Sequence, residues 1–214
     1  MSYKYVLFDF DGTLADTSEG ILAAVRYAQE KLKLEDLTQE HMQSFIGPPL
    51  KRSFAAHYKM DDEEAESAVK VFREYYAREG VYQCELYAYV PDVLRELCSQ
   101  GLVLYVATSK PTKYAQEIAD RLHIAEFFEE IVGSNLDNTR DKKREIIQYI
   151  LDKNKHVPLT DFVMIGDTYN DVNGAKICGI DSIGVTYGFG AEKDLQGARK
   201  IVSDIREIPR ICKE

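Results

Sequence analysis

The chain has 214 residues, of which 45% are hydrophobic, and its 36 acidic and 27 basic side chains give a formal net charge of −9 at pH 7. This composition is that of an ordinary globular protein, and the length predicts one domain or one domain with a sizeable insert. The negative charge disfavours nucleic acid and anionic membranes as partners, and no apolar run approaches the ~18 residues that cross a bilayer.

The first part of the chain combines one strand with a long helical segment. An apolar run rich in aromatic residues predicts a buried strand at residues 5–10. Residues 17–84 then have helical spacing, as in the apolar series from Ile21 to Leu32, for which Thr17 or Ser18 is the candidate N-cap. We therefore predict an all-helical insert directly after the first strand.

From residue 85 the pattern alternates between strand and helix. Apolar strands separated by helices are typical of a parallel sheet covered on both faces, so we predict an α/β fold with a Rossmann-like core. The predicted core domain comprises residues 1–16 and 85–214, and the predicted cap domain comprises residues 17–84. The expected strands lie at residues 102–107, 127–132, 162–165, 182–185 and 201–202. The expected helices lie near residues 91–100, 112–122 and 170–177, and a further helix carries Ile146, Ile147, Ile150 and Leu151.

Acidic residues follow two of the predicted strands. In such a sheet the ligand site lies beyond the carboxyl ends of the strands. Asp9 and Asp11 are two residues apart and can point to one face, and Asp167 and Asp171 follow a later strand. Two like charges 4 Å apart repel by about 4 kcal/mol at an effective dielectric constant of 20. A hard divalent cation would offset that repulsion, and Mg²⁺ fits an all-oxygen site best.

The residues beside these carboxylates suit a phosphate group. Thr108 and Ser109 offer hydroxyl and amide donors at the end of the second core strand, and Gly12 permits a close approach of backbone. Lys142 or Lys143, at the start of a predicted helix, would supply positive charge. The cluster therefore predicts a phosphate-binding site.

A carboxylate in such a site can also react. We predict that Asp9 attacks the phosphoryl group and forms an aspartyl phosphate, which water then cleaves. Asp11 would protonate the leaving alkoxide and later deprotonate the water.

Three motifs resemble those of the haloacid dehalogenase superfamily. Residues 9–14 read DFDGTL and are similar to its first motif, DxDGT; Thr108-Ser109 is similar to the second; and residues 166–171, GDTYND, are similar to the fourth, GDxxxD. The order and spacing of the motifs, with a helical cap after the first of them, cover the whole chain. The resemblance implies a Mg²⁺-dependent hydrolase.

The same resemblance implies roles for individual residues. Asp9 would be the nucleophile and Asp11 the acid and base, with Thr108 assisting. For the lysine of the third motif we favour Lys143 over Lys142, because in similar sequences it stands two residues before an acidic residue that matches Glu145. The implied Mg²⁺ ligands are Asp9, the Asp11 carbonyl and Asp167, with Asp171 in support.

Within the superfamily the chain is most similar to phosphoglycolate phosphatases and related small-substrate phosphatases, including nucleotidases and pyrophosphatase-like members. The likeness rests on residues 108–111 (TSKP), 45–50 (FIGPPL) and 188–190 (GFG). Where such relatives often read YPGV, this chain has YAYV at residues 87–90. The predicted substrate is a small phosphorylated metabolite, and the predicted substrate-binding residues are Gly12, Thr108, Ser109, Lys110, Lys143 and, from the cap, Arg52.

Other interpretations remain open for several of these features. Thr108 and Ser109 could cap the next helix, Arg52 could be surface charge, and residues 188–190 read as a flexible turn. A sugar-phosphate mutase of the same superfamily is an alternative function, although the nearest cap histidine after the first motif is His41. The other alternative is a phospho-receiver switch, but such modules lack a helical insert.

The cysteines and histidines bear on the expected location and metal chemistry. The four cysteines have neither CxxC spacing nor the density of a disulfide framework, which favours a reducing cytoplasm. The four histidines lie far apart, so a zinc site is not expected. We predict a cytoplasmic protein that is a monomer or a weak homodimer.

Overall fold

The computed structural model describes residues 2–137 and 139–214, which divide into two compact units. The larger unit comprises Met1–Ala15 and Leu86–Glu214, and the smaller comprises Asp16–Glu85. A two-stranded sheet of β2 (Ala15–Asp16) and β3 (Glu85–Leu86) forms where the chain passes between the units.

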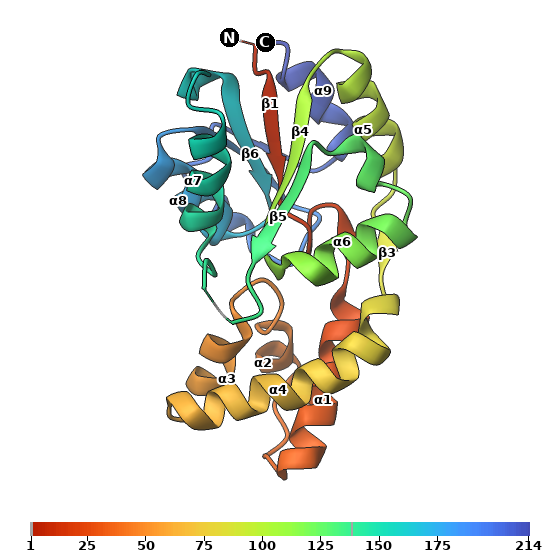
Figure 1. Ribbon diagram of the computed structural model, residues 1–214, viewed down its shortest axis with the longest axis vertical. Coiled ribbons are helices and arrows are strands. Elements are labelled where there is room, and N and C mark those ends of the chain that lie inside the picture. The colour runs from red at the N-terminus through yellow and green to blue at the C-terminus, as the bar shows by residue number, and fades with distance from the viewer. Residues whose placement is uncertain (1, 138) are drawn as a thin grey trace. The chain divides into compact units, whose positions relative to one another are not determined.

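A six-stranded parallel sheet forms the centre of the larger unit (Figure 1). Its strand order is β5-β4-β1-β6-β7-β8, so that β1 lies between β4 and β6. These findings confirm the predicted α/β fold with a helical insert after the first strand. The strands are β1 (Tyr5–Phe8), β4 (Val103–Pro111), β5 (Glu130–Ser134), β6 (Phe162–Gly166), β7 (Asp181–Val185) and β8 (Lys200–Val202).

Helices cover both faces of this sheet. In Figure 1, α7 and α8 lie side by side on one face, and α5 and α9 lie together on the other. The helices of this unit are α5 (Val90–Ser99), α6 (Thr112–Arg121), α7 (Lys143–Lys153), α8 (Tyr169–Cys178) and α9 (Ile208–Ile211). Short 3₁₀ helices lie at η2 (Ala125–Phe127), η3 (Leu159–Asp161), η4 (Glu192–Leu195) and η5 (Ile205–Glu207).

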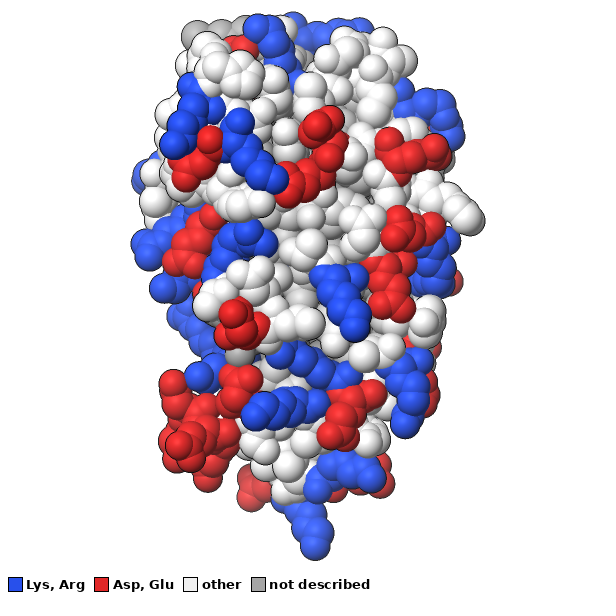
Figure 2. All heavy atoms as spheres, viewed as in Figure 1, with Lys and Arg blue, Asp and Glu red and all other residues white. Residues whose placement is uncertain are grey.

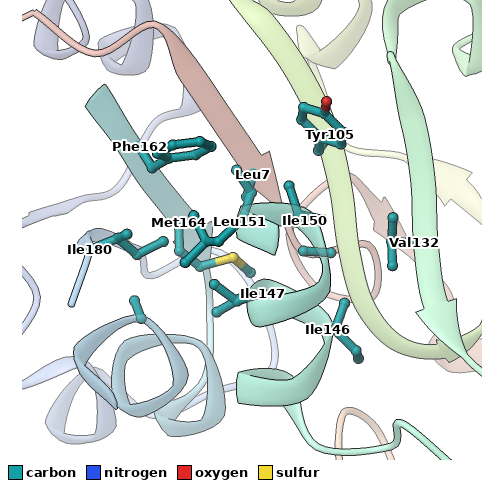
Figure 3. Packing of buried hydrophobic residues seen from close by; sticks show 12 residues of the cluster. Leu7, Tyr105, Val132, Ile146, Ile147, Ile150, Leu151, Phe162, Met164 and Ile180 are labelled. Carbon is teal, nitrogen blue, oxygen red and sulfur yellow. The ribbon is translucent and has the colours of Figure 1, made fainter. Parts of the chain in front are cut away.

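A cluster of buried apolar side chains fills the space between the sheet and α7 (Figure 3). Leu7 of β1 and Met164 of β6 meet Ile146, Ile147 and Ile150 of the helix, and all five are fully buried. Burial of such a side chain stabilises the fold by about 1.5–3 kcal/mol. This cluster holds α7 against the strands and therefore determines the position of its first residue, Lys143.

Three predicted strands differ from the observed ones by two residues or more. The first, predicted at residues 5–10, ends at Phe8 as β1. The stretch predicted at residues 127–132 begins instead at Glu130, because Phe128 first packs edge-on against Phe8, with ring centroids 6.4 Å apart. The strand predicted at residues 102–107 runs on to Pro111 as β4, with a shift in its register to β5 after Ala107.

The smaller unit is helical apart from its ends, as predicted. Its longest helix begins at a capping box in which Asp61 accepts from the Glu63 and Glu64 amides and Glu64 accepts in return from the Asp61 amide. Thr17 precedes the first helix as predicted, but the capping oxygen comes from Asp16, which accepts from the amide of Ser18 (2.9 Å). Its helices are α1 (Ser18–Leu32), α2 (Gln39–Gln43), α3 (Leu50–Tyr58), α4 (Asp62–Arg78) and the 3₁₀ helix η1 (Gly80–Tyr82).

The surface carries charges of both signs. On the face shown in Figure 2, acidic and basic side chains are interspersed. Among the described residues, no helix combines the length and the apolar character needed to cross a membrane.

Candidate active site

The two central strands bring two acidic residues together. β1 and β6 pair in parallel with Phe8 opposite Ile165. The pairing continues one residue further, where the Asp9 amide donates to the Ile165 carbonyl (2.8 Å). Asp9 follows β1 and Asp167 follows Gly166, the last residue of β6. Both aspartates therefore leave the sheet at its carboxyl edge.

A third carboxylate comes from the first turn of α8. Asp171 forms a capping box with Thr168, accepting from its amide (3.0 Å) and its hydroxyl (2.7 Å). Gly166 makes room for it, since a Cβ there would overlap with the Asp171 carboxyl group. One carboxylate oxygen from each of Asp9, Asp167 and Asp171 lies within 4.8 Å of the others, and all three residues are buried.

Among residues 2–137 and 139–214, one lysine lies between these acids. Lys143, the first residue of α7, places its Nζ 2.7 Å from Asp9 Oδ1 and 2.8 Å from Asp171 Oδ1. The ammonium also donates to the carbonyl of Ala107 (2.9 Å). Lys142, the alternative considered from the sequence, has a side chain that is 62% exposed. The structure therefore brings Lys143, and not its neighbour, to the carboxylates.

Burial of the acids makes their ionised forms costly. Burial and the nearby Asp171 raise the pKa of Asp9 to about 8, although Lys143 acts in the opposite direction. Burial and Asp171 likewise raise the pKa of Asp167 to about 6. Burial acts to lower the pKa of Lys143, but the charges of Asp171 and Asp9 outweigh it and raise that pKa. Three acids around one ammonium leave room for two further positive charges, which is the charge of a divalent cation.

The loop after β7 contacts Asp167. Asp167 Oδ2 accepts from the amides of Phe189 (2.8 Å) and Gly190 (3.3 Å), while Oδ1 accepts from the Thr13 hydroxyl (3.1 Å). A Cβ at Gly188 would overlap with the Asp167 side chain. Close packing therefore requires glycine at both positions, and the flexibility of residues 188–190 stays a prediction.

Gly12 allows the backbone to turn beneath the same aspartate. Its φ is +83°, a conformation that favours glycine, and a Cβ there would overlap with the Asp167 carboxylate. The predicted close approach of backbone at Gly12 is thus made to Asp167 itself. Substrate contact at this position stays a prediction.

Asp11 is placed differently from Asp9. Its carboxylate is not one of the three clustered acids and instead receives the Lys110 ammonium, at 2.8 Å to Oδ1 and 3.0 Å to Oδ2. Both side chains of this ion pair are nearly buried. Lys110, which we predicted to bind substrate, thus contacts the predicted acid and base.

The remaining predicted residues lie in two places. Thr108 is buried in β4 and its hydroxyl accepts from the Lys110 amide (3.2 Å), while Ser109 is half-buried beside it. Helix capping does not explain this pair, since α6 begins after Pro111 and β4 runs through both residues. Arg52 is exposed on α3 of the smaller unit, and its role stays a prediction.

Sequence reasoning missed several groups that build this site. Thr13 was visible only as part of the first motif, and the carbonyl of Ala107 has no sequence signal at all. The loop containing Phe189 did have one, since two glycines spaced two apart, at positions 188 and 190, allow close approach as well as flexibility.

Comparison with known proteins identifies what this arrangement is similar to. The profile of the haloacid dehalogenase-like hydrolases matches residues 6–185. A 5'-nucleotidase of Pseudomonas aeruginosa is 39% identical over 196 residues, which cover 92% of this chain and 88% of that protein. A phosphoglycolate phosphatase of Vibrio vulnificus is 27% identical over 194 residues, covering 87% of this chain and 85% of the relative.

Two further matches extend the comparison. The crystal structure of a predicted phosphatase from Clostridium acetobutylicum superimposes with a TM-score of 0.93 at 38% identity, covering 99% of this chain and 98% of that one. The tyrosine-protein kinase PtkA of Mycobacterium tuberculosis is 32% identical over 189 residues, covering 88% of this chain but 64% of the kinase.

Proposed function

Because the chain belongs to the haloacid dehalogenase-like hydrolases and is a phosphatase of that family, we propose that it is a Mg²⁺-dependent phosphomonoesterase acting on a small phosphorylated metabolite. The observation that carries the proposal is the buried cluster of Asp9, Asp167 and Asp171 around Lys143. Such a cluster is costly unless a cation shares it, and a cation held there can in turn attract an anionic phosphoryl group.

The donor set fits a magnesium ion. It consists of carboxylate oxygens, which Mg²⁺ prefers, and its charge exceeds that of its one ammonium by two. We assign the ion to Asp9, Asp167 and the backbone carbonyl of Asp11, with Asp171 in support, as the family resemblance implies. When bound, the ion supplies positive charge to the oxygens of the phosphoryl group.

Asp9 is the proposed nucleophile. Its Oδ1 accepts from the Phe10 amide (2.7 Å) and is paired with Lys143, so we assign the attack to Oδ2. Oδ2 forms a bond to phosphorus while the bond from phosphorus to the substrate oxygen breaks, which leaves an aspartyl phosphate and an alkoxide. Water then attacks the same phosphorus, releasing inorganic phosphate and restoring the Asp9 carboxylate.

Asp11 is the proposed general acid in the first step and the proposed general base in the second. In its protonated form it donates to the departing alkoxide, and as a carboxylate it then takes a proton from the attacking water. The Lys110 ammonium holds both oxygens of Asp11, so this lysine must share or release Asp11 when substrate enters. Lys143, Thr108 and Ser109 are proposed to contact the phosphoryl oxygens.

The substrate class follows from the relatives. The 5'-nucleotidase covers more of this chain, at higher identity, than the phosphoglycolate phosphatase. Nucleoside 5'-monophosphates are therefore the first class to test and phosphoglycolate is the second. Arg52 on α3 remains a prediction as a substrate contact, as do the cytoplasmic location and the state of monomer or weak homodimer.

A phosphate-release screen tests this proposal. Purified protein is assayed with p-nitrophenyl phosphate, nucleoside monophosphates, phosphoglycolate and pyrophosphate, with Mg²⁺ or with EDTA. We expect multiple turnovers that need Mg²⁺ and that Asp9→Asn abolishes. Near-full turnover in Asp9→Asn would rule out the nucleophile assignment.

Sugar phosphates and labelled ATP, added to the same screen, separate the alternatives. Interconversion of sugar phosphates with little release of inorganic phosphate would favour the mutase, and stoichiometric labelling without turnover would favour a receiver. Transfer of label from ATP to tyrosine would instead indicate an activity like that named for PtkA.

A further inference from the structure

The loop of residues 186–191, which follows β7, contacts both Asp167 and the turn after Asp11. We propose that this Asp167-binding loop sets the affinity of the site for its divalent cation, with Tyr187 as a positioning residue. The inference rests on the proposed function, because it concerns the cation that the carboxylate cluster is proposed to hold.

Both oxygens of Asp167 are held by neighbouring groups. The amides of Phe189 and Gly190 donate to Oδ2 (2.8 and 3.3 Å), and the Thr13 hydroxyl donates to Oδ1 (3.1 Å). A fully buried carboxylate bound on both oxygens has little freedom to rotate. Its orientation is therefore determined by where the loop and the turn place their donors.

Tyr187 links the loop to that turn. Its hydroxyl donates to the Thr13 carbonyl (3.0 Å), and its ring packs against Tyr87 with centroids 5.0 Å apart. Thr13 thus accepts from the loop through its carbonyl and donates to Asp167 through its hydroxyl. Hydrogen bonds therefore join the loop to the turn, the turn to Asp167 and Asp167 to the loop.

Two glycines allow the loop to come this close. A Cβ on Gly188 would overlap with the Gly12 carbonyl oxygen and with the Asp167 side chain, and one on Gly190 would overlap with the Asp167 carbonyl oxygen. Neither of these loop glycines has positive φ. Close packing, and not backbone conformation, is therefore what requires glycine at these two positions.

The linkage has a consequence for cation binding. Removing the Tyr187 hydroxyl leaves the Thr13 carbonyl without that donor and allows the turn to shift. The shift weakens the hydrogen bond from the Thr13 hydroxyl to Asp167. One such hydrogen bond corresponds to about a threefold to tenfold change in an equilibrium constant. The change should appear in cation affinity, since the Tyr187 hydroxyl binds the Thr13 carbonyl and Thr13 in turn donates to Asp167.

The experiment measures cation binding directly in Tyr187→Phe. Mn²⁺ and Mg²⁺ are titrated into substrate-free protein by calorimetry, and the Mg²⁺ concentration for half-maximal turnover is measured separately. We expect about a threefold to tenfold weaker affinity in both measurements, with kcat at saturating Mg²⁺ less affected. Gly188→Ala should weaken binding further, and if it fails to fold, Tyr187→Phe alone still decides the matter.

Tyr105→Phe is the matched control. Tyr105 is a buried tyrosine of β4 whose hydroxyl accepts from Asn154 (3.2 Å) in the apolar cluster. It should lower thermal stability to a similar extent as Tyr187→Phe without changing cation affinity. Unchanged cation affinity in Tyr187→Phe, or an equal loss in both variants, would overturn the inference. A wild-type protein that binds no divalent cation would instead contradict the proposed function.

Discussion

The two ends of α7 carry ion pairs of nearly equal length in opposite surroundings. At the first residue, Lys143 lies 2.7 Å from Asp9, and the two side chains are 3% and 7% exposed. At the last, Lys153 lies 2.7 Å from Glu130, and the side chains are 47% and 33% exposed. Equal distances therefore conceal very different energies, because water screens only the second pair.

The dipole of α7 disfavours the positive charge at its buried end. A positive charge is favourable near a helix C-terminus, where Lys153 lies, and unfavourable near the N-terminus, where Lys143 lies. Lys143 is nevertheless buried, because the carboxylates at the sheet edge and the Ala107 carbonyl bind its ammonium. A local preference that is violated and then compensated by tertiary contacts is typical of a functional site.

The largest expected effect is at the buried end. Lys143→Met should reduce turnover by about a thousandfold, because it removes the ammonium beside the nucleophile. In EDTA it should also destabilise the fold by about 3 kcal/mol, since a buried ion pair loses one partner. Enzyme kinetics and thermal melts measure the two effects.

Lys142→Met is the matched control for that variant. The Lys142 side chain is mostly exposed, and its Nζ lies 3.8 Å from Glu145 Oε1. It should leave both turnover and stability close to wild type. A larger loss of turnover in Lys142→Met than in Lys143→Met would reverse the assignment of the two lysines.

The middle of α7 should show the second largest effect, on stability alone. Ile147 is fully buried in the cluster of Figure 3. Ile147→Ala should cost about 2–5 kcal/mol of unfolding free energy through lost burial and the cavity left behind. Turnover per folded molecule should stay near wild type well below the melting temperature, and a loss comparable to that of Lys143→Met would show that the core and the site are not separable.

The elements of this fold were predictable where burial leaves a continuous apolar pattern. Residues 162–165 predicted β6 to within one residue, because a central parallel strand is apolar on both faces. The alternation also predicted that Asp9 and Asp167 would meet, since neighbouring parallel strands end at one edge. The start of β5 was less predictable, because the packing of Phe128 on Phe8 is a tertiary contact.

The partners of the charged residues were the hardest to predict. Sequence spacing places Asp9 and Asp11 on one face, but it does not indicate that Lys143 pairs with the first and Lys110 with the second. Nor does a glycine-rich turn indicate that its amides will bind Asp167. Such pairings depend on how segments that are distant in the sequence approach one another in the fold. Lys110 and Asp11, for example, are 99 positions apart in the chain.

A smaller effect should appear in the pH dependence of stability without a cation. Asp9 has a pKa raised to about 8 in the folded protein, so between its unfolded value and pH 8 the folded state holds the extra proton. The stability that this proton contributes is fully present below the pKa of Asp9 in the unfolded chain. It is lost as the pH rises through the pKa of Asp9 in the folded protein, which is about 8. Denaturant unfolding in EDTA should show a loss of about 1–2 kcal/mol between pH 5.5 and 7.5.

Two controls accompany that measurement. Asp9→Asn lacks the titrating group and should show a flatter profile, and saturating Mg²⁺ should restore stability at pH 7.5 by binding the ionised acids. Stability that rises with pH in EDTA, with Asp9→Asn unchanged from wild type, would contradict a raised pKa at Asp9.

The smallest expected effect lies at the exposed end of α7. Lys153 donates to both Glu130 oxygens (2.8 and 2.7 Å) and lies 4.8 Å from the centre of the Tyr149 ring. Despite this geometry, Lys153→Met should change the unfolding free energy by less than about 1 kcal/mol, because exposed pairs gain little over hydration. The change should shrink further in 1 M salt, which screens exposed charges. A loss as large as that of Lys143→Met would mean that pairing distance, and not burial, governs the energy of these two lysines.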